Sequence, residues 1–126
     1  MRQPVSKSAA GLVGLAGATA VAFGAFGAHA LRGTLDASAL ATWHTGVEYH
    51  VWHALALFVA VVGLPEGRAR RFAVGLFAAG IVLFSGSLYA LALGAPRIVG
   101  AITPIGGVAF IAGWLAVISA LRANRR

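Results

Sequence analysis

Four long apolar stretches joined by short connections constrain the fold of this chain more than any other feature. They cover residues 9–31, 47–64, 72–93 and 98–121. A helix that crosses the hydrocarbon core needs about 20 apolar residues, and in lipid each backbone group must be hydrogen-bonded within its own segment. None of the stretches alternates apolar and polar residues as a barrel strand would. The sequence therefore predicts an all-α integral membrane protein, with four transmembrane helices bundled in one domain over residues 1–126.

The composition supports this fold class. Of the 126 residues, 60% are hydrophobic and only 10% are charged, whereas about a quarter of the residues are charged in an ordinary soluble domain. The chain has no cysteine, which excludes disulfides, thiolate metal sites and cysteine nucleophiles together. Soluble globular, disordered and collagen-like chains are excluded by the same figures.

The distribution of basic residues predicts the orientation in the membrane. Eight of the ten Lys and Arg residues flank the two termini and the connection between the second and third stretches, and two, Arg32 and Arg97, lie on the other side. Lys and Arg in short flanking segments collect on the cytoplasmic side, so we expect cytoplasmic N- and C-termini. The net charge of +7 then serves topology and contact with the bilayer's anionic headgroups at the cytoplasmic side, and we expect no nucleic-acid binding.

Glycine and alanine recur on one face of several predicted helices. Such faces let helix backbones approach closely in lipid, although a general bias toward small residues would leave a similar pattern. Phe23 and Phe26 fall on the opposite face of the first helix, where we expect lipid or a second subunit. The glycines expected to pack between helices are Gly14, Gly17, Gly24, Gly86, Gly106 and Gly113.

Two helix boundaries can be predicted from capping residues. Asp36 is a suitable N-cap and Gly46 a suitable end for a short interfacial helix between the first two spans, with Trp43 at headgroup level. Thr103 followed by Pro104 is a suitable start for the regular part of the fourth helix. The alternative is a proline kink in a longer helix that already includes residues 98–101.

The polar residues within the spans gather toward the outer side of the predicted topology. We expect them to form one hydrogen-bonded cluster in the outer third of the bilayer, because an unpaired polar group beside hydrocarbon is costly. The carboxylate of Glu48 should lie near Arg97, Arg32 or the free amides after Pro104. This polar cluster is the one predicted site for binding or proton exchange, and its members are His29, Glu48, Tyr49, His53, Ser85, Ser87, Tyr89, Arg97 and Thr103.

A metal or haem site is the less favoured interpretation of the histidines. His50 and His53 are three residues apart and share a helical face. The same helix offers no third ligand on that face, so His29 of the first helix would have to supply it. We therefore expect structural histidines, and we predict no metal and no cofactor.

Four sequence strings resemble a known family. They are GAFGAH at 24–29, TGVEYHVWH at 45–53, LFSGSLY at 83–89, and TPIGG at 103–107 followed by AGW at 112–114. The chain resembles the domain of unknown function 423 family, the small YgdD-like membrane proteins, from Gly11 to Arg122. The resemblance implies a multi-pass, four-helix protein of the bacterial inner membrane and supplies no reaction. His29, Glu48, Tyr49 and His53 match positions of the family, whereas the position of His50 often carries Gln.

Three classes of function remain open at this point. The favoured one is a non-catalytic membrane protein, either a homo-oligomer or a subunit, assembly factor or scaffold element of a larger complex. A small transport or channel element is the first alternative, with the polar cluster as its vestibule. A redox subunit that binds haem or metal through His29 and His53 is the second. No complete catalytic constellation is present in the sequence, so we do not expect an enzyme.

Overall fold

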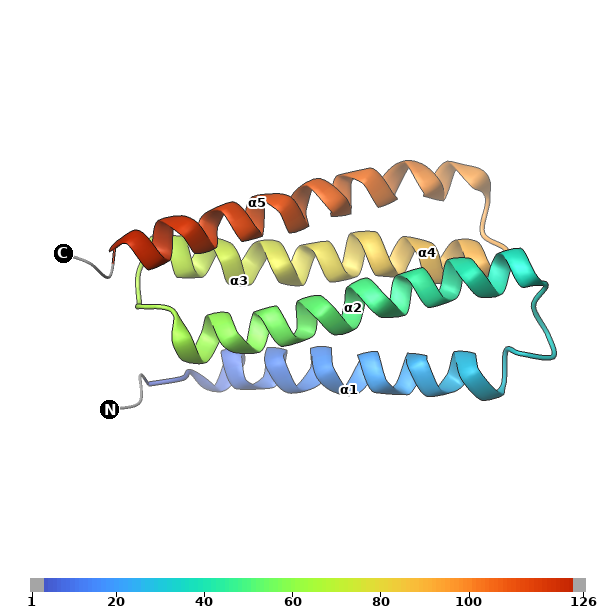
Figure 1. Ribbon diagram of the computed structural model, residues 1–126, viewed down its shortest axis with the longest axis horizontal. Helices are drawn as coiled ribbons and strands as arrows, with labels where there is room; N and C mark the ends of the chain where they lie inside the picture. Colours follow the sequence, from blue (N-terminus) through green and yellow to red (C-terminus); the bar gives the residue numbers. More distant parts are fainter. Residues whose placement is uncertain (1–3, 124–126) are drawn as a thin grey trace.

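The computed structural model describes residues 4–123 as a bundle of long, nearly antiparallel helices (Figure 1). The basic residues Arg2, Arg125 and Arg126, which contribute to the orientation argument, lie outside the described residues. Four helical segments are long and apolar enough to cross a membrane, as predicted. The elements are α1 (Lys7–His29), α2 (Ala37–Gly63), α3 (Arg68–Gly80), the π-helical turn η1 (Ile81–Ser85), α4 (Gly86–Ala92), the 3₁₀ turn η2 (Arg97–Ala101) and α5 (Ile102–Ala123).

Helix α2 is the structural centre of the bundle. It packs against α1 on one side and against α3, η1 and α4 on the other, while α5 lies along α3 and η1. In Figure 1 the described chain enters and leaves at one end of the bundle, and the α1–α2 and α4–α5 connections lie at the opposite end. This arrangement is the one required for two termini on the same side of a membrane.

The predicted interfacial helix does not exist as a separate element. Asp36 is indeed an N-cap, with its Oδ1 accepting from the Ala39 amide at 2.8 Å, but the helix it starts is α2 itself, which runs without a break to Gly63. No proline interrupts this segment, and the hydroxyls of Thr42 and Thr45 donate to carbonyls one turn earlier. Gly46, which was expected to end the helix, lies within it and is buried against Tyr89.

Trp43 is also placed differently from its predicted position at headgroup level. Its side chain is only 2% exposed, and its Nε1 donates to the Phe23 carbonyl of α1 at 2.9 Å. The ring lies 4.5 Å from that of Tyr89, centroid to centroid. Trp43 therefore joins α1, α2 and α4 from inside the bundle.

The fourth span starts before Thr103. The 3₁₀ turn η2 covers Arg97–Ala101 and continues directly into α5 from Ile102. Thr103 and Pro104 thus lie in the first turn of a helix that has already begun, and the Thr103 hydroxyl meets Ser87 instead of capping α5. The prediction of Thr103 as an N-cap was wrong, and the alternative with residues 98–101 helical is closer to the structure.

Large aromatic side chains, each placed over a glycine, fill the contacts between helices. A Cβ atom on Gly113 would lie 2.7 Å from the Phe77 ring, and one on Gly46 would lie 2.8 Å from the Tyr89 ring. Phe110 covers Gly80 and Trp43 covers Gly27 in the same way. In addition, a Cβ on Gly106 would lie 2.7 Å from the Cα of Phe84, so the backbones of α5 and η1 are in direct contact.

The small-residue prediction was therefore correct for Gly106 and Gly113 and wrong for several other glycines. A Cβ on Gly14, Gly17 or Gly86 would meet no atom within 4 Å, and one on Gly24 would make an ordinary 3.4 Å contact with Val47. Phe23 was expected on the outer face. It is 36% exposed, but its ring also lies 4.9 Å from that of Tyr89, centroid to centroid, and Phe26 is 46% exposed. In a membrane protein, the helix face that carries glycine and alanine does not have to face the other helices, because hydrocarbon and protein interior are similarly apolar.

Candidate functional site

The polar side chains inside the bundle form short, separate hydrogen-bonded groups along the inner face of α2. His50 and His53 are both buried on this face, with 2% and 5% exposure. Their position follows from the helical period, because residues three apart share a face that α2, as the central helix, presents to its neighbours.

His50 connects three helices. Its Nε2 lies 3.0 Å from the Ala16 carbonyl and 3.1 Å from the Thr19 hydroxyl of α1, and its Nδ1 lies 2.8 Å from the Tyr89 hydroxyl of α4. Because a carbonyl can only accept, Nε2 carries the proton and Nδ1 accepts from Tyr89. A neutral imidazole satisfies all of these partners.

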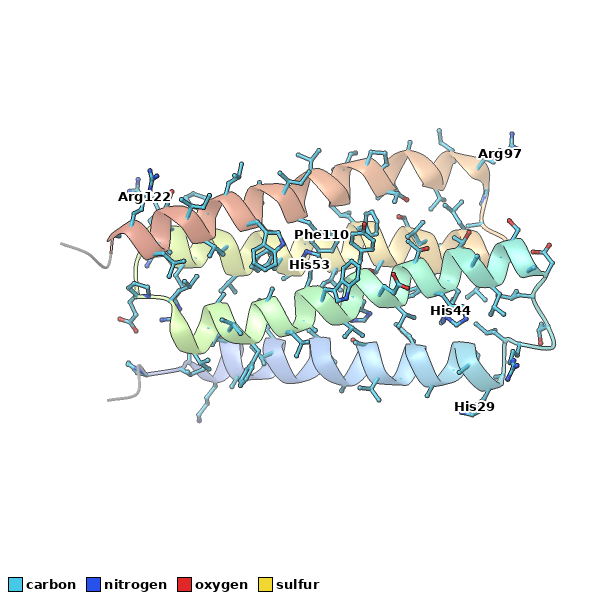
Figure 2. The ribbon with its side chains drawn as sticks, viewed as in Figure 1. His29, His44, His53, Arg97, Phe110 and Arg122 are labelled. Atoms are coloured by element: carbon cyan, nitrogen blue, oxygen red, sulfur yellow. The ribbon has the colours of Figure 1, made fainter. Side chains whose placement is uncertain are left out.

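His53 has an equally complete set of partners. Its Nδ1 donates to the Tyr49 carbonyl at 2.7 Å, and its Nε2 accepts from the indole N–H of Trp114 in α5 at 3.1 Å. The imidazole stacks on Phe110 with a centroid distance of 3.6 Å (Figure 2). Since an indole N–H can only donate, the tautomer is fixed with its proton on Nδ1. Both ring nitrogens are thereby committed within the chain.

Two buried serines of the third span make further hydrogen bonds. Ser85, at the end of the π-helical turn, donates to the Gly46 carbonyl at 2.7 Å, and Ser87 lies 2.5 Å from the Thr103 hydroxyl. Ser87 also donates to the Phe84 carbonyl at 2.9 Å. No buried side-chain nitrogen or oxygen in residues 4–123 lacks a hydrogen-bond partner. The interior is therefore a set of satisfied contacts between helices.

Four side chains of the predicted polar cluster lie outside these groups. Tyr49 takes part only through its backbone carbonyl, and the other three are exposed. His29 is exposed at the end of α1 and Arg97 is exposed at the start of η2, both far from His53 (Figure 2). Glu48 is exposed on the outward face of α2, and among the described residues it makes no ion pair with Arg32 or Arg97 and no hydrogen bond to the amides after Pro104. The prediction of one cluster around Glu48 was wrong, because the inward contacts of Trp43, His50 and His53 fix the rotation of α2 and leave Glu48 on its outward face.

The separation of His29 from His53 also removes the pair on which the haem or metal alternative depends. Within residues 4–123, no group of three or more His, Asp or Glu side chains is close enough to hold a metal ion.

Sequence reasoning missed several of the partners. Thr19 and the Ala16 carbonyl hold His50, and neither was included in the predicted polar cluster. Trp114 donates a hydrogen bond to His53. Apart from its place in the AGW string, nothing in the sequence indicated this contact. Thr19 could have been found as the one hydroxyl residue in an otherwise apolar span, since such a group forms hydrogen bonds to neighbouring helices.

The comparisons with known proteins agree with the fold and with the sequence strings. A family described as "Protein of unknown function (DUF423)" matches residues 23–107. The chain belongs to the DUF423 family. Relatives in this family include the UPF0382 membrane protein YwdK of Bacillus subtilis, which is 51% identical over 80% of this chain and 85% of its own length. The UPF0382 inner membrane protein YgdD of Escherichia coli K12 is 43% identical over 84% of this chain and 83% of its own length.

The residues matched by the family contain most of the contacts between helices described above. Residues 23–107 run from the Phe23 contact with Trp43 to the Gly106 contact with η1, and they include every hydrogen bond described above except those of Ala16, Thr19 and Trp114. No solved structure matches the chain. Together with the four candidate spans, these relatives identify the chain as a multi-pass membrane protein of a bacterial inner-membrane family.

Proposed function

We propose that this DUF423 protein is a non-catalytic membrane subunit or assembly element that binds a partner helix through the outward face of α2. The position of Glu48 carries the proposal. The side chain is exposed on the surface of the bundle, and no described residue neutralises it.

The depth of Glu48 makes this exposure costly. The preceding residue, Val47, contacts Gly24 of α1, which is five residues before the end of that helix at His29. At 1.5 Å per residue, Glu48 lies about 8 Å below the end of α1, on a surface that would otherwise face lipid. A carboxyl group in hydrocarbon costs on the order of a few kcal/mol unless a partner or a proton satisfies it. A hydrogen-bond donor on a neighbouring transmembrane helix would remove that cost.

The surrounding surface suits a helix. Along the same face of α2, Trp52 is 52% exposed, Leu55 61% and Val59 60%. A partner helix would bury these side chains while its polar group meets Glu48. The satisfied interior supports a non-catalytic role, since both buried histidines have their ring nitrogens occupied by fixed partners.

Site-specific photo-crosslinking in native membranes tests the proposal. A crosslinking residue placed at Leu55, on the face of Glu48, should give a discrete protein adduct. The matched control is Val108 of α5, which is 65% exposed on a different face and should give none. Glu48→Leu should abolish the Leu55 adduct and Glu48→Gln should keep it, because the amide still forms hydrogen bonds.

The mass of the adduct identifies the partner. An adduct of twice the chain mass would make the partner a second copy, and any other discrete mass would make it a different subunit. Equal labelling of lipid alone from both positions would contradict a partner-binding face.

A further inference from the structure

Helix α1 leaves an open seam along α3. It packs against α2 and makes little contact with α3, and in Figure 1 it lies at the edge of the bundle with α2 as its neighbour. Two hollows lie in this seam, and α2 forms the floor of both through Val61 and Leu57. They are about one helical turn apart on each helix: Ala9 to Leu12 on α1, Val61 to Leu57 on α2, and Val74 to Ala78 on α3.

The first hollow lies at the end of the bundle that carries the termini and is basic. Its volume is about 470 Å³, and its charged lining residues are Arg70, Arg71 and Glu66. Glu66 and Arg70 lie 3.9 Å apart, and the Arg70 side chain is only 11% exposed. Arg71 is exposed and makes no ion pair within residues 4–123. The first hollow therefore presents an available positive charge beside a paired arginine.

The helix ends around this hollow add to its preference for anions. Gly67, the N-cap residue of α3, also lines the hollow, and no side chain caps the helix. Its first amides are therefore available as donors, at the positive end of the helix dipole. Ser6 lines the hollow from the start of α1. An anionic group with several acceptor oxygens fits this combination of an arginine and free amides.

The second hollow continues the seam toward the middle of the membrane and is apolar. Its volume is about 210 Å³, and Thr19, its one polar lining side chain, donates to carbonyls of its own helix. The remaining lining residues are aliphatic: Leu12, Leu15, Ala16, Leu57, Ala78, Ile81 and Val82. This surface offers an acyl chain contact on three sides.

The length of the two hollows together corresponds to one leaflet. They extend from Ser6 to Thr19 along the first span and from Gly67 to Val82 along the third span, which includes η1. At 1.5 Å per residue these lengths are about 20 Å and about 22 Å. Half of a bilayer, headgroups included, is also about 20 to 22 Å thick. A free phosphate would occupy the first hollow alone and leave the second unexplained.

We propose that the seam between α1 and α3 binds one anionic phospholipid of the leaflet at the end of the bundle that carries the termini. The phosphate lies against Arg71 and the start of α3, and one acyl chain lies along Leu12, Leu15 and Ile81 over the floor formed by Leu57. This site is independent of the α2 face proposed to bind a partner, since it lies between two other helices.

Native mass spectrometry of the detergent-purified full chain, titrated with phosphatidylglycerol or phosphatidylcholine, tests the headgroup. We expect one phosphatidylglycerol per chain, bound more tightly than phosphatidylcholine. Arg71→Gln should weaken phosphatidylglycerol binding about fivefold, the effect of about one basic side chain near an anionic surface. Arg122→Gln is the matched control, because Arg122 lies at the same end but outside the seam, and it should leave the binding unchanged. Equal losses in the two variants would show nonspecific attraction and overturn the site.

A second pair of variants tests the acyl chain. Leu15→Trp narrows the second hollow, whereas Val21→Trp adds the same bulk to α1 outside it, and both original side chains are well exposed, at 65% and 72%. Only Leu15→Trp should reduce phosphatidylglycerol binding, and inorganic phosphate at millimolar concentration should not displace the lipid. Displacement by phosphate, or equal binding by the two variants, would overturn the lipid assignment in favour of a simple anion site or none.

Discussion

At the residue scale, the two histidines on the inner face of α2 show how this protein buries polar side chains with all their ring nitrogens paired. His50 and His53 each have two committed ring nitrogens, and the partners come from α1, α4 and α5 as well as from α2 itself. Each histidine therefore fixes the position and rotation of neighbouring helices, which apolar contacts alone specify poorly in lipid.

The hydrogen bond from Tyr89 to His50 should be measurable as stability. Tyr89→Phe leaves Nδ1 of His50 without a donor and should cost about 1 kcal/mol of unfolding free energy, within the range for hydrogen bonds between membrane helices. Tyr49→Phe is the matched control, because the Tyr49 hydroxyl makes no hydrogen bond within the described residues. Unfolding of the detergent-solubilised protein with increasing denaturant measures both, and equal stability of the two variants would contradict the assigned bond.

The effect of a Gly→Ala substitution on stability should depend on the free space around each glycine. Gly106→Ala places a methyl group against the backbone of Phe84 and Leu83, and overpacking of this kind costs about 1 to 3 kcal/mol. Gly14→Ala adds the same atom where nothing lies within 4 Å and should be neutral or slightly stabilising, because alanine favours a helix. Thermal unfolding in detergent separates the two, and a Gly14→Ala variant as unstable as Gly106→Ala would contradict the packing.

At the element scale, the third span departs from regular helix at one place. The turn η1 at Ile81–Ser85 is π-helical, with the Gly86 amide bonded to the Ile81 carbonyl. A π-helical turn corresponds to one extra residue in an α-helix. Here it brings the backbone of Phe84 against Gly106 and places Ser85 beside the Gly46 carbonyl.

Deletion of one residue tests the role of this turn. Removing Val82, which is 69% exposed, should convert η1 to regular α-helix and keep α3 and α4 in register, so that the protein folds with reduced stability. Removing Ile111, which is 63% exposed in the regular helix α5, rotates the two halves of that helix by about 100° relative to each other and should prevent folding. Size-exclusion chromatography in detergent measures the folded fraction, and the opposite order would refute the interpretation of η1.

At the scale of the whole molecule, the described chain begins and ends at one end of the bundle. The side of the membrane that this end faces follows from the basic residues alone. Lys7, Arg68, Arg70, Arg71 and Arg122 lie at this end, and Arg32 and Arg97 lie at the other. We expect the end that carries the termini to face the cytoplasm.

A topology reporter tests this orientation. A reporter enzyme that is active only outside the cytoplasm should be silent when fused after Arg126 and active when fused after Gly94, in the turn between α4 and η2. Activity after Arg126 together with silence after Gly94 would reverse the orientation. The lipid bound in the seam would then belong to the outer leaflet.

The sequence by itself determined the features that depend on the residues of a single segment, such as the number of spans and a helix cap. The length and composition of the apolar stretches predicted four spans, because a lipid environment forces each segment to satisfy its own backbone, and Asp36 was correctly predicted as a cap. The family was recognised from short strings that include Glu48, His53 and Ser85, and the family match confirms it. These signals are local and need no knowledge of neighbours.

Only the tertiary structure decided which face of each helix points inward. In water, the hydrophobic pattern would identify that face, but lipid and protein core are similarly apolar and the pattern loses this information. The predicted inner face of α1, with Gly14 and Gly17, therefore proved open, while Thr19, from the opposite face, contacts His50 inside the bundle. The outward direction of Glu48 could not be predicted for the same reason. It depends on the rotation of α2, and that rotation is fixed by the contacts of His50, His53 and Trp43 with the other helices.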